Sequence, residues 1–178
     1  MNIDSYLKEN KLGIIIREGE KKDLQGVLDL IKELASFEKA PLEVSNTLEM
    51  MEEDGFGKNP VFKFFVAEKE GKLIGMALYY IKYSTWKGKC VYLEDIIVTE
   101  SMRGKKIGDK LFYEVVRASR DLNVQRLEWQ VLSWNNPAIN FYKKYKTQFD
   151  DEWINCKLIH NQLQENKLIS NAGLKFEI

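Results

Sequence analysis

The sequence contains very little of what most metal and nucleophile sites need. Among its 178 residues are one histidine, His160, and two cysteines, Cys90 and Cys156, which form no Cys-x-x-Cys unit. Zinc sites usually draw on several closely spaced cysteine and histidine ligands, so no metal site is expected. A Ser-His-Asp triad would have to use His160, and no Gly-x-Ser-x-Gly turn presents a serine. We therefore expect two reduced cysteines and neither a zinc enzyme nor a triad hydrolase.

Long apolar runs and an excess of charge of one sign are missing as well. No apolar stretch reaches the roughly 20 residues of a membrane-spanning helix, and the N-terminus, MNIDSYLKENK, lacks the apolar segment of a secretion signal. Lysine and arginine number 27, as do aspartate and glutamate. This balance removes the electrostatic argument for a nucleic-acid or membrane-surface binder. We expect a cytoplasmic protein that binds neither nucleic acid nor a membrane.

The apolar content is sufficient for a folded core. Hydrophobic residues make up 44% of the chain, which argues against disorder, and the length suits one domain. We expect a single domain over residues 1–178, with its core at about 13–160 and a C-terminal extension at 161–178. The extension is mixed in polarity and could form a short helix and a strand or no regular structure.

Hydrophobic periodicity predicts an alternation of strands and helices. Strands are expected at Leu12–Glu18, from Val61, from Lys72, from Cys90, and at Val124–Leu132 and Glu152–Ile159. Helices are expected from Asp23, at Val44–Glu53, at Lys105–Asp121 and from a cap at Asn136 to Tyr145. Short connections make the three middle strands an antiparallel meander. The fold class is therefore α+β or mixed α/β, with one strand-helix-strand crossover from Val91 to Leu132.

Two features stand together in the stretch YLEDIIVTESMRGKKIG. Two acids, Glu94 and Asp95, interrupt an apolar strand, and a basic turn with Gly104 and Gly108 then leads into a helix. The first N–H groups of a helix have no partner inside it and favour anions, so the turn is a candidate pyrophosphate site. It is neither a P-loop nor a Gly-x-Gly-x-x-Gly turn, and many surface turns share its composition. For Asp95 the residues leave a structural and a functional role equally open.

The chain resembles the GNAT (Gcn5-related) N-acetyltransferases, and within them the diamine acetyltransferase group that includes the spermidine/spermine N1- and thialysine N-acetyltransferases. The matching segments occur in the order of the family and cover roughly residues 14–158. They are LIKELASFEKAP, EEDGFGKNP, MALYYIKYSTWKGK, YLEDIIV, MRGKKIG and WNNPAINFYKKY. The general turn, R/Q-x-x-G-x-G/A, is moderately specific, whereas the joint presence of these segments is highly specific.

The resemblance implies the GNAT acyl-CoA N-acyltransferase fold, in which a splayed, mostly antiparallel sheet flanked by helices holds acetyl-CoA between the strand of Glu94 and the strand of Leu127. It also implies a homodimer. By resemblance, backbone groups of Ile96, Ile97 and Val98 contact the pantetheine; Arg103, Gly104, Lys105, Lys106, Ile107, Gly108 and Asp109 hold the pyrophosphate; and Asn135, Asn136, Pro137, Ala138 and Tyr145 line the other side of CoA.

The resemblance also implies the catalytic and acceptor residues. An amine acceptor with a pKa of about 10.4 arrives protonated, and a departing thiol with a pKa of about 8.5 leaves more easily when protonated. Glu94 is the candidate base and Tyr142 the candidate acid. Backbone N–H groups near Ile96 would polarise the thioester oxygen. The substrate-binding residues implied by the resemblance are Phe37, Glu38, Glu94, Glu128, Trp129 and Gln130. Glu38 could equally be a solvated surface residue, and Trp129 is expected to lie partly in the core.

Two positions depart from the pattern of the family. Lys106 replaces the middle glycine of the turn, and we expect little effect on CoA because only its backbone N–H is needed. Ser84 and Thr85 stand before Trp86 where the spermidine enzymes carry an acid, which makes a short amine or thialysine-like amino acid at least as suitable as a long polyamine. Two alternatives stay open: a GNAT-fold module that binds acyl-CoA without turnover, and an acetyltransferase for protein or peptide amines.

Overall fold

The structure is a computed structural model that describes residues 12–164. The chain divides into two compact units, which separate between Gln130 and Val131. The first unit carries the sheet and most of the helices. In the second unit, residues 131–164 form two short helices. A single domain over the whole chain remains a prediction.

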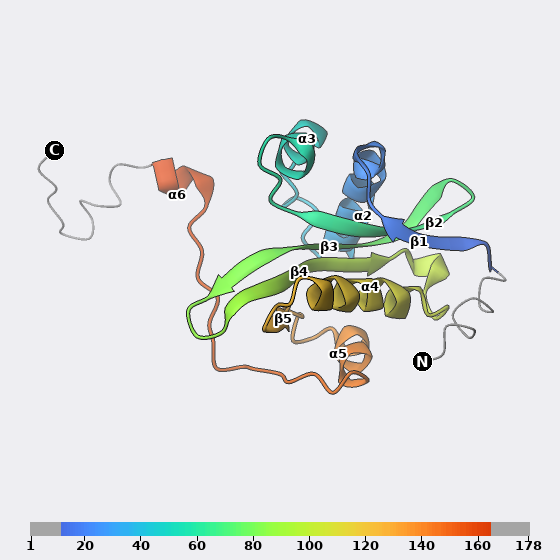
Figure 1. The fold of residues 1–178 in the computed structure, drawn as a ribbon. Helices are drawn as coiled ribbons and strands as arrows, with labels where there is room; N and C mark the ends of the chain where they lie inside the picture. The colour runs from blue at the N-terminus through green and yellow to red at the C-terminus, as the bar shows by residue number, and fades with distance from the viewer. Residues whose placement is uncertain (1–11, 165–178) are drawn as a thin grey trace, which may run out of the picture. The chain divides into compact units, whose positions relative to one another are not determined.

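The first unit is built on a five-stranded sheet whose strands lie in chain order (Figure 1). The strands are β1 (Ile14–Glu18), β2 (Lys63–Lys69), β3 (Lys72–Ser84), β4 (Gly88–Val98) and β5 (Arg126–Glu128). Neighbours are antiparallel except β4 and β5, which are parallel and joined through a helix. The expected mixed fold class, meander and crossover are thus confirmed.

Helices cover both faces of this sheet. Helices α2 (Leu24–Phe37) and α3 (Leu48–Phe56) lie on one face, and α4 (Ile107–Asp121) lies on the other (Figure 1). Leu24 and Val27 of α2 are fully buried with Met76 of β3, and α4 buries Leu111 and Val115. Full burial of such a side chain stabilises the fold by about 1.5 to 3 kcal/mol. The apolar faces predicted from the 3.6-residue period are therefore the ones that pack.

Several predicted boundaries are shifted. Helix α3 begins after Thr47, whose side chain accepts a hydrogen bond from the Met50 N–H, and not at Val44. Strand β5 occupies only the centre of the predicted Val124–Leu132 segment. Helix α5 (Asn136–Lys143) is capped by Asn135, whose Oδ1 accepts from the Ala138 N–H at 3.2 Å, so Asn136 is its first residue.

The strand predicted at Glu152–Ile159 is wrong. In the second unit this segment forms no regular element and its residues are exposed. An apolar alternation becomes a strand only beside a partner edge, and the pattern alone does not provide one. The short helix α6 (His160–Gln164) follows. Most of the extension predicted at 161–178 lies outside the described residues.

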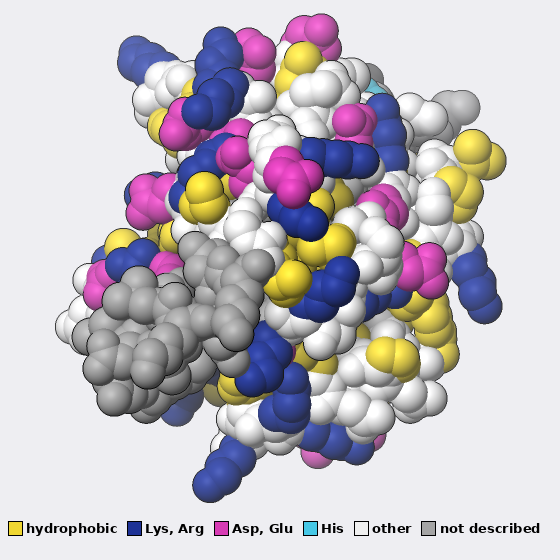
Figure 2. Space-filling view, turned by 90° about the vertical axis from the view of Figure 1, so that its right-hand side faces the viewer, with side chains coloured by type: hydrophobic (Ala, Val, Ile, Leu, Met, Phe, Trp, Pro, Cys, Tyr) yellow, Lys and Arg dark blue, Asp and Glu magenta, His cyan; other side chains and the backbone are white. Residues whose placement is uncertain are grey.

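The surface of the described residues carries charges of both signs. Figure 2 shows lysine and arginine side chains beside aspartate and glutamate side chains over much of the face that it displays. None of the helices in residues 12–164 is both long enough and apolar enough to cross a membrane.

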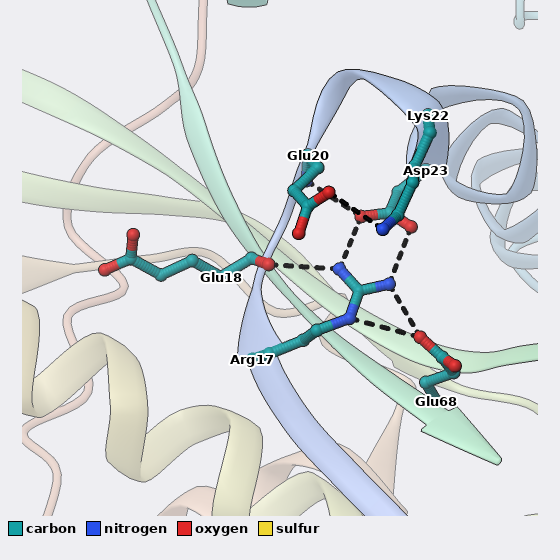
Figure 3. Close-up of polar contacts among 6 residues, drawn as sticks. All are labelled: Arg17, Glu18, Glu20, Lys22, Asp23 and Glu68. Atoms are coloured by element: carbon teal, nitrogen blue, oxygen red, sulfur yellow. Dashed lines mark hydrogen bonds and ion pairs between the residues drawn. The ribbon is translucent and has the colours of Figure 1, made fainter. Parts of the chain in front are cut away.

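An ion-pair network joins β1, β2 and the start of α2 (Figure 3). The Arg17 guanidinium donates to both carboxylate oxygens of Asp23, at 2.6 and 2.8 Å, and to Oε2 of Glu68 at 2.6 Å. Asp23 also accepts from the Glu20 N–H at 2.8 Å. Asp23 is buried, and the hydrogen bond from Arg17 is the main reason that its pKa lies below the ordinary value. Arg17 of β1 therefore holds Asp23, at the start of α2, and Glu68 of β2 together.

Replacing Asp23 with Asn should lower the free energy of unfolding at pH 7 by roughly 2 to 3 kcal/mol, because Arg17 loses a bidentate, largely buried partner. Because the pKa of Asp23 is lower in the folded protein than in the unfolded chain, its carboxylate stabilises the fold at pH values above the unfolded-state pKa of about 3.9. This stabilisation is lost as the pH falls through the lower folded-state pKa. The deficit of the variant should therefore shrink below pH 4 in urea titrations. Lys22→Gln, which breaks an exposed pair with Glu20, is the control and should not shift the midpoint.

Candidate functional site

The pair of acids in β4 sits on a β-bulge. Leu78 of β3 pairs with Asp95, whereas the next residue, Tyr79, pairs with Leu93. Glu94 is therefore the extra residue, without a partner on β3. Bulges bend a strand locally and often occur beside functional sites, where they redirect side chains.

The bulge changes which way the side chains of β4 point. In a regular strand neighbouring side chains alternate between faces, so Glu94 and Asp95 would point to opposite sides. With the extra residue, Asp95 shares the face of its partner Leu78, and Glu94 shares the face of Tyr92, which is paired with Tyr80. We call the side of β3, β4 and β5 that carries these residues and Glu128 the acid face. The two carboxylates lie on it together.

The charges on the acid face act on one another. Burial and the nearby negative charges of Glu94 and Glu38 raise the pKa of Asp95 to about 6. Glu38 stands at the C-terminal cap of α2, and burial raises its pKa too. Asp95 is half-buried and Glu94 is exposed. Three carboxyl groups from α2 and β4 thus form one region of negative potential, which favours a cation.

Two tyrosines line the same face. The ring centroids of Tyr80 and Tyr92 are 5.3 Å apart. Burial, followed by the charge of Glu94, raises the pKa of Tyr92 to about 12, and burial and Glu94 also raise the pKa of Tyr80. Both rings therefore stay neutral at physiological pH. They offer aromatic faces to a cation beside the carboxylates.

The strands β4 and β5 part beyond the tyrosines. Their pairing runs from Cys90 with Arg126 to Tyr92 with Glu128, and β4 then continues from Leu93 to Val98 past its last partner on β5. The backbone groups of Ile96 to Val98 lie in this diverging stretch. It is the splay that the resemblance predicts.

A basic turn connects β4 to the N-terminus of α4. Gly104 and Lys106 both have positive φ, +77° and +59°, and Lys106 is the N-cap of the helix. The family glycine at position 106 therefore has a conformational reason, because only glycine adopts this region without strain. The first N–H groups of α4 point out of its end and, with Lys105 and Lys106, suit an anion.

Helix α2 is tied to this turn by two contacts. Thr99 donates from Oγ1 to the Glu33 carboxylate at 2.8 Å. Arg103 donates from Nε to the Val98 carbonyl at 3.0 Å, and its guanidinium carbon lies 5.0 Å from the centre of the Phe37 ring. Phe37 and Glu38 are thereby fixed near the turn.

The other predicted site residues lie in different surroundings. Trp129 packs edge-to-face on Phe112 of α4, with ring centroids 5.3 Å apart, so it points away from the acid face. Gln130 ends the first unit. The second unit holds the following predicted residues: Asn135, Asn136, Pro137, Ala138, Tyr142 and Tyr145. Tyr142 is a buried residue of α5. The roles of all these residues remain predictions.

Within residues 12–164, no group of three or more His, Cys, Asp or Glu side chains is arranged to hold a metal ion. The sequence patterns missed part of the polar site. Asp95 was left undecided, and Tyr80 and Tyr92 were not singled out. The adjacent acids in one strand were the available signal, but the bulge that gives them a common face follows from pairing with β3.

Comparisons with known proteins identify the family and the fold. Residues 27–146 match the Acetyltransferase (GNAT) family. The chain is 38% identical over 143 residues to the thialysine N-epsilon-acetyltransferase of Bos taurus, covering 76% of this chain and 84% of the relative. It is 36% identical over 134 residues to the spermidine/spermine N(1)-acetyltransferase-like protein 1 of Homo sapiens, covering 71% of this chain and 19% of that protein. A solved aminoglycoside N-acetyltransferase AAC(6')-Iy in complex with CoA has the same fold, with a TM-score of 0.65 at 18% identity over 82% of this chain and 94% of that one.

Replacing Asp95 with Asn should raise the free energy of unfolding at pH 7 by about 1 to 2 kcal/mol, after allowance for its partial exposure. Its raised pKa means that folding favours the protonated acid, so the parent protein loses stability as the pH rises from about 4 through about 6. Urea unfolding at pH 4 and pH 7 measures the effect, which should be absent at pH 4. Glu70→Gln, at an exposed turn, is the control; an equal difference at both pH values would contradict the explanation.

Replacing Lys106 with Gly should raise the free energy of unfolding by about 0.5 to 1 kcal/mol, because glycine adopts the left-handed conformation without steric strain. Lys106→Ala removes the same ammonium but keeps a Cβ, so it should bring no such gain. Thermal or urea unfolding of the two variants compares them directly. Equal changes would mean that the side-chain charge, and not the backbone, determines the effect.

Proposed function

The chain belongs to the Acetyltransferase (GNAT) family, and we propose that it transfers the acetyl group of acetyl-CoA to a primary amine of a small cationic acceptor. The acid face carries this proposal. Glu38, Glu94 and Asp95 converge there beside two neutral tyrosines, which suits an ammonium group. The relatives named as thialysine and spermidine/spermine-type acetyltransferases support the same class of acceptor.

The acceptor must lose a proton before it can attack, and we propose that the carboxylates of β4 take it. A lysine-like amine has a pKa of about 10.4, so transfer to an ordinary glutamate at about 4.3 is uphill by about 8 kcal/mol. Transfer to Asp95, with its pKa raised to about 6, is uphill by only about 6 kcal/mol. We assign binding of the ammonium to Glu94 and Glu38, and we assign Asp95 a share of the proton transfer predicted for Glu94.

The donor fits the diverging end of β4. The backbone of Ile96 to Val98 lies past the last β5 pair, and the basic turn at the N-terminus of α4 suits a pyrophosphate. Acetyl-CoA supplies an acyl thioester as the electrophile. We propose that backbone N–H groups near Ile96 polarise its carbonyl oxygen, that Arg103 to Asp109 hold the pyrophosphate, and that the Tyr142 hydroxyl protonates the departing thiol. The second-unit residues Asn135 to Ala138 and Tyr145 would contact CoA.

The remaining features of the proposal come from the family resemblance. We propose a homodimer in the cytoplasm, without a metal cofactor. Glu128 is retained as an acceptor residue because it lies on the acid face next to Tyr92. Direct attack of the amine on the thioester needs no covalent enzyme intermediate, and holding both reactants in line supplies much of the rate.

The test is thiol release from acetyl-CoA with purified protein and a panel of thialysine, lysine, ornithine, diamines, spermidine and a lysine peptide. Small amines should be acetylated. Asp95→Asn and Glu94→Gln should each lower kcat/KM by about 100-fold or more, and Asp95→Asn should also remove an acidic limb near pH 6 from the kcat profile. Glu70→Gln, an exposed acid in the turn between β2 and β3, is the matched control and should keep full activity.

Three outcomes separate the alternatives. Binding of CoA without thiol release for any amine would indicate that the protein is a non-catalytic acyl-CoA-binding module and not an enzyme. Release with the peptide but with none of the small amines would indicate a protein acetyltransferase. Full activity in both β4 variants would remove these carboxylates from the mechanism while leaving the reaction itself in place.

A further inference from the structure

The segment that links β4 to the basic turn, residues 99–103, is held by a side chain from another element. It contains the short 3-10 helix η3 (Glu100–Met102), and Thr99 is the N-cap residue of that helix. The Thr99 side chain accepts no hydrogen bond from η3. Its Oγ1 instead donates to the carboxylate of Glu33 in α2, 2.9 and 2.8 Å from the two oxygens. Thr99 thus leaves the capping of η3 to another group.

Glu33 provides that cap. Its Oε1 accepts a hydrogen bond from the Glu100 N–H at 3.2 Å, and Glu100 is the first residue of η3. The first N–H groups of a helix have no partner inside it, and the capping oxygen usually comes from the residue directly before the helix. Here the oxygen comes from α2. The cap therefore fixes where η3 lies relative to α2, in addition to satisfying the N–H group.

A second contact holds the other end of the segment against the same helix. Phe37 follows Glu33 by four residues, so the two side chains lie on one face of α2. The guanidinium carbon of Arg103 lies 5.0 Å from the centre of the Phe37 ring, and Nε of Arg103 donates to the Val98 carbonyl at 3.0 Å. Segment 99–103 is thus attached to α2 at its first and its last residue.

The charge of Glu33 does not explain its place, because the residues that follow suit an anion. Gly104 comes directly after the segment, and Lys106 is the N-cap of α4. A carboxylate near this turn repels a phosphate group. Solvent and salt screen such repulsion at the surface, whereas a hydrogen bond acts at one fixed position. The contribution of Glu33 is therefore the placement of the chain.

We propose that Glu33 is a positioning residue for the acetyl donor, which rests on the proposed function. By capping η3 from α2, it holds the basic turn, residues 103–106, where the N–H groups at the start of α4 meet the pyrophosphate of acetyl-CoA. Glu33 itself contacts neither reactant. A donor without a pyrophosphate gains nothing from an ordered turn, so dependence on Glu33 should appear only with a phosphate-bearing donor.

The test compares two donors that share the thioester and the pantetheine arm: acetyl-CoA, and S-acetylpantetheine, which has no phosphate. Thiol release with the best acceptor of the amine panel gives kcat/KM for each donor. In Glu33→Ala the ratio of the acetyl-CoA value to the S-acetylpantetheine value should fall by about 10-fold, mainly through KM for acetyl-CoA. Misfolding or a disturbed acceptor site lowers both values together, so neither changes the ratio.

Matched variants show whether the cap is responsible. Glu33→Gln keeps a carbonyl oxygen that accepts from Thr99 and Glu100, so its ratio should stay within about threefold of the parent value. Thr99→Val removes the hydroxyl donor and should lower the ratio, whereas Thr99→Ser should preserve it. Asp29→Ala is the control, because it removes an exposed acid of the same helix whose carboxylate contacts Gln25, and it should leave the ratio unchanged.

A Glu33→Ala ratio within about twofold of the parent value would overturn the assignment. An equal fall in Glu33→Gln would overturn it as well, since charge and not the cap would then be responsible. So would a parent protein that uses both donors equally, because it would recognise no pyrophosphate. In each of these cases an amine is still acetylated, so the proposed function stands. Failure of the parent protein to release thiol from either donor with any amine of the panel would instead remove the proposed function together with the role of Glu33.

Discussion

The site depends on a single extra residue in β4. Because Glu94 has no partner on β3, the strand turns both of its acids to one face, where Glu38 of α2 joins them. A regular strand of the same composition would send one carboxyl group toward α4 and the apolar side of the sheet. Burying an unpaired carboxylate there would be strongly unfavourable. The bulge thus makes it possible for an apolar strand to carry two acids and gives them a common face.

The same strand separates the two reactants. On its acid face lie the carboxylates and tyrosines that suit an ammonium, and past Tyr92 its free edge opens away from β5. The helix that follows begins with a turn that suits phosphate. One strand and its next turn therefore carry a place that suits a positive group and a place that suits a negative one.

Much of this could be read from the sequence. The apolar faces of α2 and α4 follow from the helical period, and the meander from short turns, because these signals are local. The bulge could not be predicted from the sequence, because it depends on how Leu93 and Asp95 of β4 pair with β3 around Leu78. The Arg17 network depends on Glu68, far along the chain. For Glu152–Ile159 the apolar pattern was present but a partner strand was not. The cap of α5 was placed one residue late because two asparagines, Asn135 and Asn136, precede the proline.

Helix α2 makes contact with both halves of this arrangement. Through Glu33 it is bonded to Thr99 beside the donor turn, through Phe37 it lies against Arg103, and its last residues lead directly into Glu38. The C-terminal end of α2 therefore borders both the turn that suits an anion and the carboxyl groups of the acid face. Because one helix end contacts the turn and also carries Glu38, a substitution in this end of α2 would disturb both parts of the site at once.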